Sequence, residues 1–172
     1  MPVINIEIKA RCADPDRIRA ILQSQDARFV GEDHQLDTYF VVDEGRLKLR
    51  EGDIENSLIY YRRPNDAEPK RSDVLLYKTS KDAGLKDVLE GFLDTLVVVD
   101  KRREIYFIEN VKFHIDRVKD LGSFVEIEAI DTDGSLSESE LREQCSRFME
   151  LLAIEKAELL HNSYSDMLLA LR

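Results

Sequence analysis

Hydrophobic and polar residues alternate along much of this chain, as they do in strands whose two faces meet different surroundings. Near the N-terminus, Ile4-Asn5-Ile6-Glu7-Ile8-Lys9 places its isoleucines on one face and its polar residues on the other. Phe124-Val125-Glu126-Ile127-Glu128 repeats this alternation later in the chain. One face of these strands therefore carries charged residues, which are acidic at both ends of the β-rich region and basic between them. This pattern indicates a polar cavity that binds a highly charged ligand through metal ions, rather than a solvated rim.

The same patterning predicts a series of strands interrupted by few helices. Asp14 and Pro15 are typical of a helix N-terminus, and Ser137 with Glu140 forms a capping-box pattern. Strands are expected at about 3–12, 27–33, 36–43, 46–51, 57–63, 73–79, 97–108, 111–119 and 123–131. Helices are expected after Asp14 and at about 83–95, 137–152 and 162–171, with a loop at 63–69. This order predicts an α+β fold, an antiparallel sheet or barrel whose apolar outer face is covered by helices.

Length and composition restrict the class of protein. A chain of 172 residues corresponds to one domain with a sizeable core. Its 43% hydrophobic and 35% charged residues are typical of a soluble globular protein, and no apolar stretch approaches the roughly 20 residues that span a bilayer. No signal-peptide pattern precedes the first strand. Because Cys12 and Cys145 lie far apart and suggest no disulfide framework or metal knuckle, we expect a cytoplasmic protein. Without a spanning stretch, we expect no membrane partner.

The net charge of −10 argues against a nucleic-acid partner, which would require a basic surface. The basic residues nevertheless recur at alternate positions of the predicted strands, so that they share faces. These runs are Arg46, Lys48 and Arg50, then Tyr60 with Arg62, and Lys101 with Arg103. Arginine offers phosphate a planar fork and lysine a point charge. We therefore expect a local anion site, although each run by itself is also consistent with a solvated strand face.

Acidic residues on the same strand faces are candidates for metal binding. Glu126 and Glu128 lie two residues apart, close enough to share a divalent cation, and Glu7 faces the same way from the first strand. Asp116, on the preceding strand, is a further candidate. Mg²⁺ accepts one or two carboxylates together with phosphate oxygens and water. The alternative is that these are ordinary solvent-facing strand residues.

Two other residue types are weaker candidates. Tyr39 shares a strand face with Asp37 and either orients a nucleophile or lies at the edge of the core. The histidines show no metal-ligand spacing, and His114 is expected to be packed within its strand. No phosphate-binding glycine loop and no hydrolase or protease motif is present.

Taken together, these runs resemble the CYTH superfamily of triphosphate tunnel enzymes along nearly the whole chain. The family's E-x-E-x-K strand is matched at Glu7 and Lys9, and its basic strand resembles the run from Arg46 to Arg50. The long D-x-V-x-x-L-G-x-F-x-E-x-E motif is matched almost completely between Asp116 and Glu128. Three further runs resemble family segments, namely Asp37-Thr38-Tyr39-Phe40, Tyr60-Tyr61-Arg62-Arg63-Pro64 and Lys101-Arg102-Arg103. The segment near the end of the chain, His161-Asn162-Ser163-Tyr164, is similar to that of the class IV adenylyl cyclases.

The resemblance implies that residues 1–172 form a single CYTH-like domain, an eight-stranded antiparallel barrel with a charged lumen and helices outside. It implies a phosphate-binding set of Lys9, Lys48, Arg50, Arg62, Lys101 and Arg103. It also implies Mg²⁺ or Mn²⁺ on Glu7, Asp116, Glu126 and Glu128, with Tyr39 and Arg62 in the catalytic positions. The substrate is then a triphosphate, either tripolyphosphate, thiamine triphosphate or ATP, and hydrolysis is the first hypothesis.

Two departures from the family pattern leave alternatives open. Asn5 replaces the first acid of the metal motif, and Arg62 replaces a lysine that helps a tyrosine position water in some tunnel triphosphatases. Arginine stays protonated and cannot share a proton in that way. A non-catalytic polyphosphate-binding barrel therefore remains a rival hypothesis. A class IV adenylyl cyclase is another, because it would use the same phosphate-binding residues and the motifs do not separate the two enzymes. The oligomeric state is also open, a homodimer included.

Overall fold

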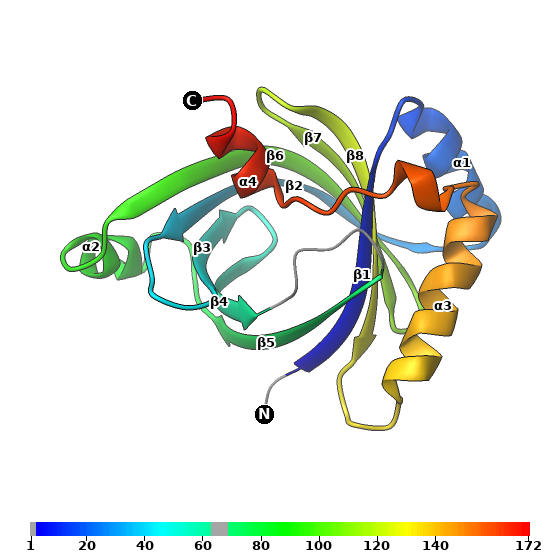
Figure 1. The fold of residues 1–172 in the computed structure, drawn as a ribbon, viewed down its shortest axis with the longest axis horizontal. Coiled ribbons are helices and arrows are strands. Elements are labelled where there is room, and N and C mark those ends of the chain that lie inside the picture. Colours follow the sequence, from blue (N-terminus) through cyan, green and yellow to red (C-terminus); the bar gives the residue numbers. More distant parts are fainter. Residues whose placement is uncertain (1–2, 63–68) are drawn as a thin grey trace.

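The computed structural model describes residues 3–62 and 69–172, which form a closed β-barrel with helices on its outside (Figure 1). Neighbouring strands pair antiparallel in the order β1-β5-β4-β3-β2-β6-β7-β8. The strands are β1 (Val3–Arg11), β2 (Arg28–Phe40), β3 (Arg46–Gly52), β4 (Asn56–Arg62), β5 (Lys70–Lys78), β6 (Thr95–Ile108), β7 (Val111–Val118) and β8 (Gly122–Asp131). The helices are α1 (Pro15–Ser24), α2 (Leu85–Glu90), α3 (Glu138–Leu151), the 3₁₀ turn η1 (Lys156–Glu158) and α4 (Tyr164–Leu169). The predicted α+β antiparallel barrel is confirmed, and no described helix is long and apolar enough to cross a membrane.

The main apolar core lies outside the barrel, between its wall and two helices. α1 and α3 cover the outer face of β1, β7 and β8, on the right of Figure 1. Ile6 on β1 and Ile127 on β8 are fully buried there, and Phe113 on β7 packs edge-on against Phe148 of α3 with ring centroids 5.0 Å apart. Because apolar residues occupy this outer face, the alternating polar residues of the same strands face the barrel interior.

β2 is one strand of 13 residues where the sequence predicted two, at 27–33 and 36–43. At the junction of the two predicted strands, Asp33 and Gln35 are fully buried rather than placed in a turn. Asp33 accepts hydrogen bonds from the backbone N–H groups of Ile54 at 2.8 Å and Glu55 at 2.9 Å. Asp33, where the hydrophobic pattern is interrupted, is therefore a buried side chain that holds the turn between β3 and β4 in place.

α2 is shorter than the helix predicted at 83–95 and buries a single residue, Leu89. Leu89 packs against Phe40 and Leu49 on the barrel wall. Val88 on the same helix and Phe92 just after it are 62% and 71% exposed. Most of the predicted loop at 63–69 lies outside the described residues.

Candidate functional site

The barrel encloses a polar cavity of about 160 Å³, which we call the lumen. Alternate side chains of the strands point into it, so strands far apart in the sequence contribute to one lining. The predicted site residues that the structure brings together on this lining are Glu7, Lys9, Tyr39, Lys48, Arg50, Lys101, Arg103, Glu126 and Glu128. Residues on the lining without a predicted role include Asn5, Glu55, Lys112, His114 and Tyr164.

Asp37 joins the basic residues of one wall of the lumen. Its carboxylate accepts hydrogen bonds from Lys48 at 3.1 Å, from Arg50 at 2.8 and 2.9 Å, and from Lys101 at 2.7 Å. Burial alone would raise the pKa of Asp37, but these neighbouring cations together hold it well below its usual range. One buried anion therefore fixes the positions of three cations before any ligand arrives. We call Lys48, Arg50 and Lys101 the Asp37-linked cations.

Lys101 is the most perturbed of the Asp37-linked cations. Its side chain is almost fully buried, and this burial lowers its pKa to about 7 despite the opposing effect of Asp37. Arg103 and Arg50 lower the pKa of Lys101 further. An anionic ligand in the lumen would favour the protonated form, so binding near neutral pH is expected to take up a proton.

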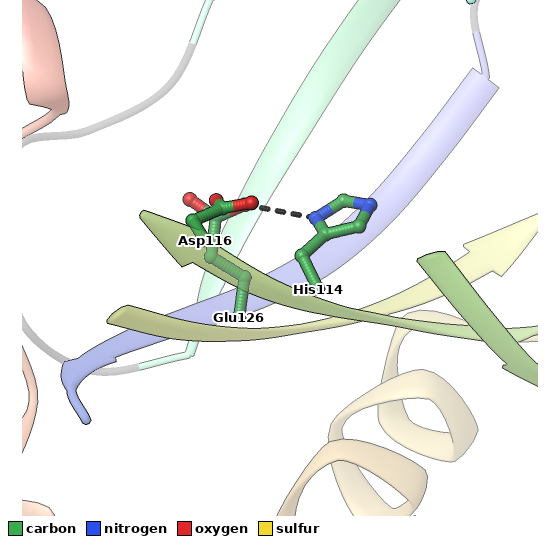
Figure 2. A group of neighbouring side chains, drawn as sticks. All are labelled: His114, Asp116 and Glu126. Carbon is green, nitrogen blue, oxygen red and sulfur yellow. Dashed lines mark hydrogen bonds and ion pairs between the residues drawn. The ribbon is translucent and has the colours of Figure 1, made fainter. Parts of the chain in front are cut away.

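Arg103 joins a second group, which includes two of the predicted metal ligands. It donates to both oxygens of Asp116 at 2.7 Å and to Glu126 at 3.0 Å. The Tyr164 hydroxyl also donates to Asp116, at 2.7 Å. His114, Asp116 and Glu126 lie close together on β7 and β8, and Nδ1 of His114 is 3.0 Å from Glu126 (Figure 2). Both oxygens of Asp116 are thus already engaged by hydrogen-bond donors.

Neighbouring positive charges keep the carboxylates of Asp116 and Glu126 ionised. Burial alone would raise the pKa values of Asp116 and Glu126, but Arg103 lowers both, and His114 and Lys9 lower that of Glu126 further. The pKa of Glu126 ends well below its usual range. Burial lowers the pKa of His114. These carboxylates therefore balance the charge of Arg103, and Asp116 in particular is an ion-pair partner rather than an open ligand.

A different part of the lumen also carries oxygen ligands suited to a hard metal ion. Asn5 and Glu7 lie on β1 beside Glu128 on β8, with Glu7 and Glu128 directly paired in register. Asn5 donates its amide N–H to Glu128 at 2.5 Å. Its amide oxygen is buried and accepts no hydrogen bond from any described residue. Two carboxylates and an amide oxygen are the hard ligands that Mg²⁺ and Mn²⁺ prefer, so the side chains present fit such an ion.

Tyr39 lies inside the lumen, next to the Asp37-linked cations. Its hydroxyl accepts a hydrogen bond from Lys48 at 3.3 Å and is 3.5 Å from the hydroxyl of Tyr61. Tyr39 therefore lies beside a charged residue, and the residue of β4 whose hydroxyl is near it is Tyr61.

Arg62 lies outside the lumen, which corrects its predicted roles in phosphate binding and catalysis. On β4 the residues that face inward are Ser57, Ile59 and Tyr61, so strand alternation turns Arg62 outward. Its side chain is 64% exposed, and it donates to Glu44 at 3.0 Å. Arg63 and Pro64, the rest of the segment that resembles the family motif, lie outside the described residues.

Arg62→Ala is expected to change the affinity for tripolyphosphate by less than about twofold, because an exposed ion pair contributes little. Arg50→Ala, on the neighbouring strand β3 but facing inward, is expected to weaken binding about tenfold or more, since a charge-assisted hydrogen bond contributes roughly 1.5–3 kcal/mol. Titration calorimetry in metal-free buffer measures both. If Arg62→Ala lost as much affinity as Arg50→Ala, Arg62 would have to be counted among the phosphate-binding residues.

The C-terminal segment closes part of the lumen. The backbone carbonyl of His161 accepts a hydrogen bond from Lys70 at 2.6 Å, and that of Asn162 accepts one from Lys9 at 3.2 Å. The ring of Tyr164 lies 4.2 Å from the Lys9 ammonium group. Residues close to the C-terminus thus contact cations that begin on β1 and β5.

The sequence contains partial signals for the lining residues that were not predicted. Lys112 and His114 alternate with Asp116 on β7, so the strand period places all three on one face. Glu55 lies in a turn, where no period applies, yet it contacts Lys112 and accepts from Arg50 at 3.4 Å. The position of Glu55 among these cations is therefore visible only in the structure.

A closed antiparallel barrel whose lumen combines linked cations with oxygen ligands defines a class of protein built to enclose an anionic ligand. The chain belongs to the CYTH domain family, whose profile matches residues 3–164.

Individual relatives are similar along nearly the whole chain. A Methanocaldococcus jannaschii protein with a provisional name, adenylate cyclase, is 26% identical, with 96% of this chain and 98% of that protein covered. The Pyrococcus horikoshii protein PH1012 is similar in structure with a TM-score of 0.81 at 22% identity, covering 94% of this chain and 98% of that one. A Hippeastrum protein, provisionally an adenylyl cyclase and described as having a dominant triphosphatase activity, has a TM-score of 0.64 at 14% identity, covering 98% and 94%.

Proposed function

We propose that this chain is a metal-dependent enzyme that binds a triphosphate in the lumen and hydrolyses it. The observation that carries the proposal is the set of cations that face this one cavity, Lys9, Lys48, Arg50, Lys101, Arg103 and Lys112. Several adjacent phosphate groups provide acceptors for such a set. Membership of the CYTH family and the triphosphatase activity described for the Hippeastrum protein support hydrolysis.

The cations would both bind and activate the substrate. The Asp37-linked cations are held in place by hydrogen bonds, so they would stabilise charge on phosphate oxygens with little rearrangement. Arg103, two residues from Lys101 on β6 and held by Asp116 and Glu126, would add a further fixed charge. In a loose phosphoryl-transfer transition state, such positioning and neutralisation supply most of the rate enhancement. Tyr39, beside Lys48, would orient the attacking water.

The metal would lie on the oxygen ligands that β1 and β8 place side by side. Glu7, Glu128 and the amide oxygen of Asn5 would hold Mg²⁺ or Mn²⁺, which would supply positive charge against phosphate oxygens and make nearby water more acidic. Asn5 brings an oxygen without a charge, so the ion would be held less tightly than by three acids. Asp116 and Glu126 would remain with Arg103.

Formation of cyclic AMP from ATP is the second candidate, favoured by the provisional name of the Methanocaldococcus jannaschii protein, which is similar over almost its whole length. This reaction needs the same phosphate-binding cations, but the ribose 3′-hydroxyl must reach the α-phosphorus in place of water.

Product analysis distinguishes the candidates. We expect purified protein with Mg²⁺ or Mn²⁺ to release phosphate from tripolyphosphate or ATP, and we expect EDTA and Arg50→Ala each to abolish the release. Cyclic AMP with pyrophosphate would establish the cyclase instead. Tight binding of both compounds without any product would contradict both activities and leave a binding barrel.

A further inference from the structure

One acidic side chain reaches into the lumen from a turn and contacts two of its cations. Glu55 lies between β3 and β4, contacts Lys112, and accepts a hydrogen bond from Arg50 at 3.4 Å. From these contacts we infer that Glu55 holds the place of a phosphate group on the two cations and is displaced when the substrate binds. The inference rests on the proposed function, because it concerns how the same lumen selects its ligand.

The ion pair between Glu55 and Lys112 crosses the lumen. Glu55 directly precedes β4, and Lys112 lies on β7. In the closed barrel these two strands are separated by β3, β2 and β6 in one direction and by β5, β1 and β8 in the other, so they lie on opposite sides. The carboxylate therefore occupies space in which a ligand bound to the same cations would lie.

Glu55 is an anion at neutral pH, as a phosphate group is. Burial alone would raise its pKa, but Lys112 and Arg50 hold the pKa of Glu55 below its usual range. Carboxylate and phosphate oxygens are both acceptors for ammonium and guanidinium groups. Lys112 is 9% exposed, and a buried charge without a partner is costly. An anion is therefore favoured at this position whether or not a ligand is bound.

Glu55 is better able to move than the other acids that contact the lumen cations. Asp37 and Asp116 are each 1% exposed and lie on strands, whereas the side chain of Glu55 is 28% exposed and comes from a turn. The backbone of this turn is held, since the N–H groups of Ile54 and Glu55 donate to Asp33. The side chain alone can therefore turn toward solvent and leave both cations to a ligand.

Such a displaceable anion would favour long phosphate ligands over short ones. A ligand that displaces Glu55 must first replace the contacts that Glu55 makes, and only a ligand that also reaches further cations gains more than it loses. Tripolyphosphate can span several cations of the lumen, whereas orthophosphate cannot. After hydrolysis, the return of Glu55 to its two cations would help to release the shorter products.

Glu51 provides a matched control for Glu55. Both glutamates contact a lysine, and their side chains are 22% and 28% exposed, but Glu51 lies on the outer face of β3, 3.7 Å from Lys86. Glu55→Gln is expected to tighten tripolyphosphate binding about tenfold, because it removes the competing charge. Glu51→Gln changes the net charge equally and is expected to stay within about twofold of the parent. Calorimetry in EDTA, which prevents metal-dependent turnover, measures both affinities.

A double variant shows whether the gain arises at the cations. Lys112→Ala removes one of the two contacts, so in that background Glu55→Gln is expected to gain less than about threefold. In chemical denaturation without ligand, Glu55→Gln alone is expected to be less stable than the parent, because Lys112 loses its anion. Tighter binding together with lower stability is the signature of a displaced anion, since a merely structural role would weaken both.

The outcomes separate this inference from the proposed function. If the parent binds tripolyphosphate and Glu55→Gln binds it equally or more weakly, Glu55 is no competing anion, while the triphosphate site stands. If Glu51→Gln tightens binding as much as Glu55→Gln, net charge is the cause and the inference fails as well. If neither the parent nor Glu55→Gln binds tripolyphosphate, the proposed function fails and this inference fails with it.

Discussion

Arg103→Ala is expected to lower the free energy of unfolding by about 3–5 kcal/mol at neutral pH, because it leaves buried carboxylates without their cation. Arg103 is 4% exposed and donates to both oxygens of Asp116 at 2.7 Å and to Glu126 at 3.0 Å. Binding of tripolyphosphate should be lost as well. Chemical denaturation in EDTA measures the stability, and calorimetry measures the binding.

Arg102→Ala is the matched control for this change. Arg102 is adjacent on β6 but faces outward, with a side chain that is 51% exposed and 3.6 Å from Glu32. A surface substitution of this kind is expected to change stability by no more than about 0.5 kcal/mol. Similar losses in the two variants would mean that β6 tolerates no substitution, and the buried ion pairs would not be the cause.

The pH dependence of the loss provides a second check. In the parent, Arg103 holds the pKa of Asp116 below its usual range against burial, so this carboxylate stabilises the fold above its unfolded pKa of about 3.9. That contribution disappears as the pH falls through the folded pKa. Without Arg103, burial dominates and raises the folded pKa, although Tyr164 still donates to Asp116. The difference in stability between parent and variant should therefore be larger at pH 7 than at pH 4. An equal difference at both would exclude an electrostatic origin.

Strand alternation explains why much of the barrel and its lining could be predicted. Ile6 and Ile8 alternate with Glu7 and Lys9, and the structure places the first pair under the helices and the second pair on the lumen. The same period holds on β3 for Lys48 and Arg50. A side-chain period of 2 determines the face of a residue wherever the strand itself is recognised.

Some residues could not be predicted, because knowing which strand face a residue lies on does not determine its role. Arg62 was aligned by its resemblance to a motif, yet its neighbour Tyr61 faces inward, and a shift of one residue moves a side chain to the opposite face. Asp116 was placed on the correct face, but the sequence does not show that Arg103 and Tyr164 engage it. Such pairing depends on which side chains meet across the closed barrel, and therefore on the three-dimensional register.

The same arrangement recurs in the lumen: buried acids hold cations at fixed positions until a ligand binds. Asp37 holds Lys48, Arg50 and Lys101, and Asp116 holds Arg103. Unpaired charges in so enclosed a space would be costly to desolvate. The acids of the lumen therefore need not all bind metal, and the division between counter-ions and metal ligands can be tested directly.

Glu128→Gln is expected to weaken Mn²⁺ binding at least about tenfold, whereas Asp116→Asn should change it by less than about threefold. Glu128 accepts a hydrogen bond from Asn5, whose amide oxygen has no hydrogen-bond partner among the described residues, while Asp116 has both oxygens engaged by Arg103. Calorimetry with Mn²⁺ at pH 7 measures both affinities. Denaturation in EDTA should show the reverse order, with Asp116→Asn the less stable variant, because it leaves Arg103 with a weaker partner.

Turnover at increasing Mn²⁺ completes the comparison. If Glu128 acts by holding the metal, saturating Mn²⁺ should restore part of the activity of Glu128→Gln by mass action, since the phosphate-binding cations are intact. In Asp116→Asn, added metal should restore nothing, because the defect lies in the position of Arg103. A loss of Mn²⁺ affinity in Asp116→Asn as large as that in Glu128→Gln would contradict the division. It would mean that Asp116 leaves Arg103 to bind the metal, and that the ion pair belongs only to the ligand-free barrel.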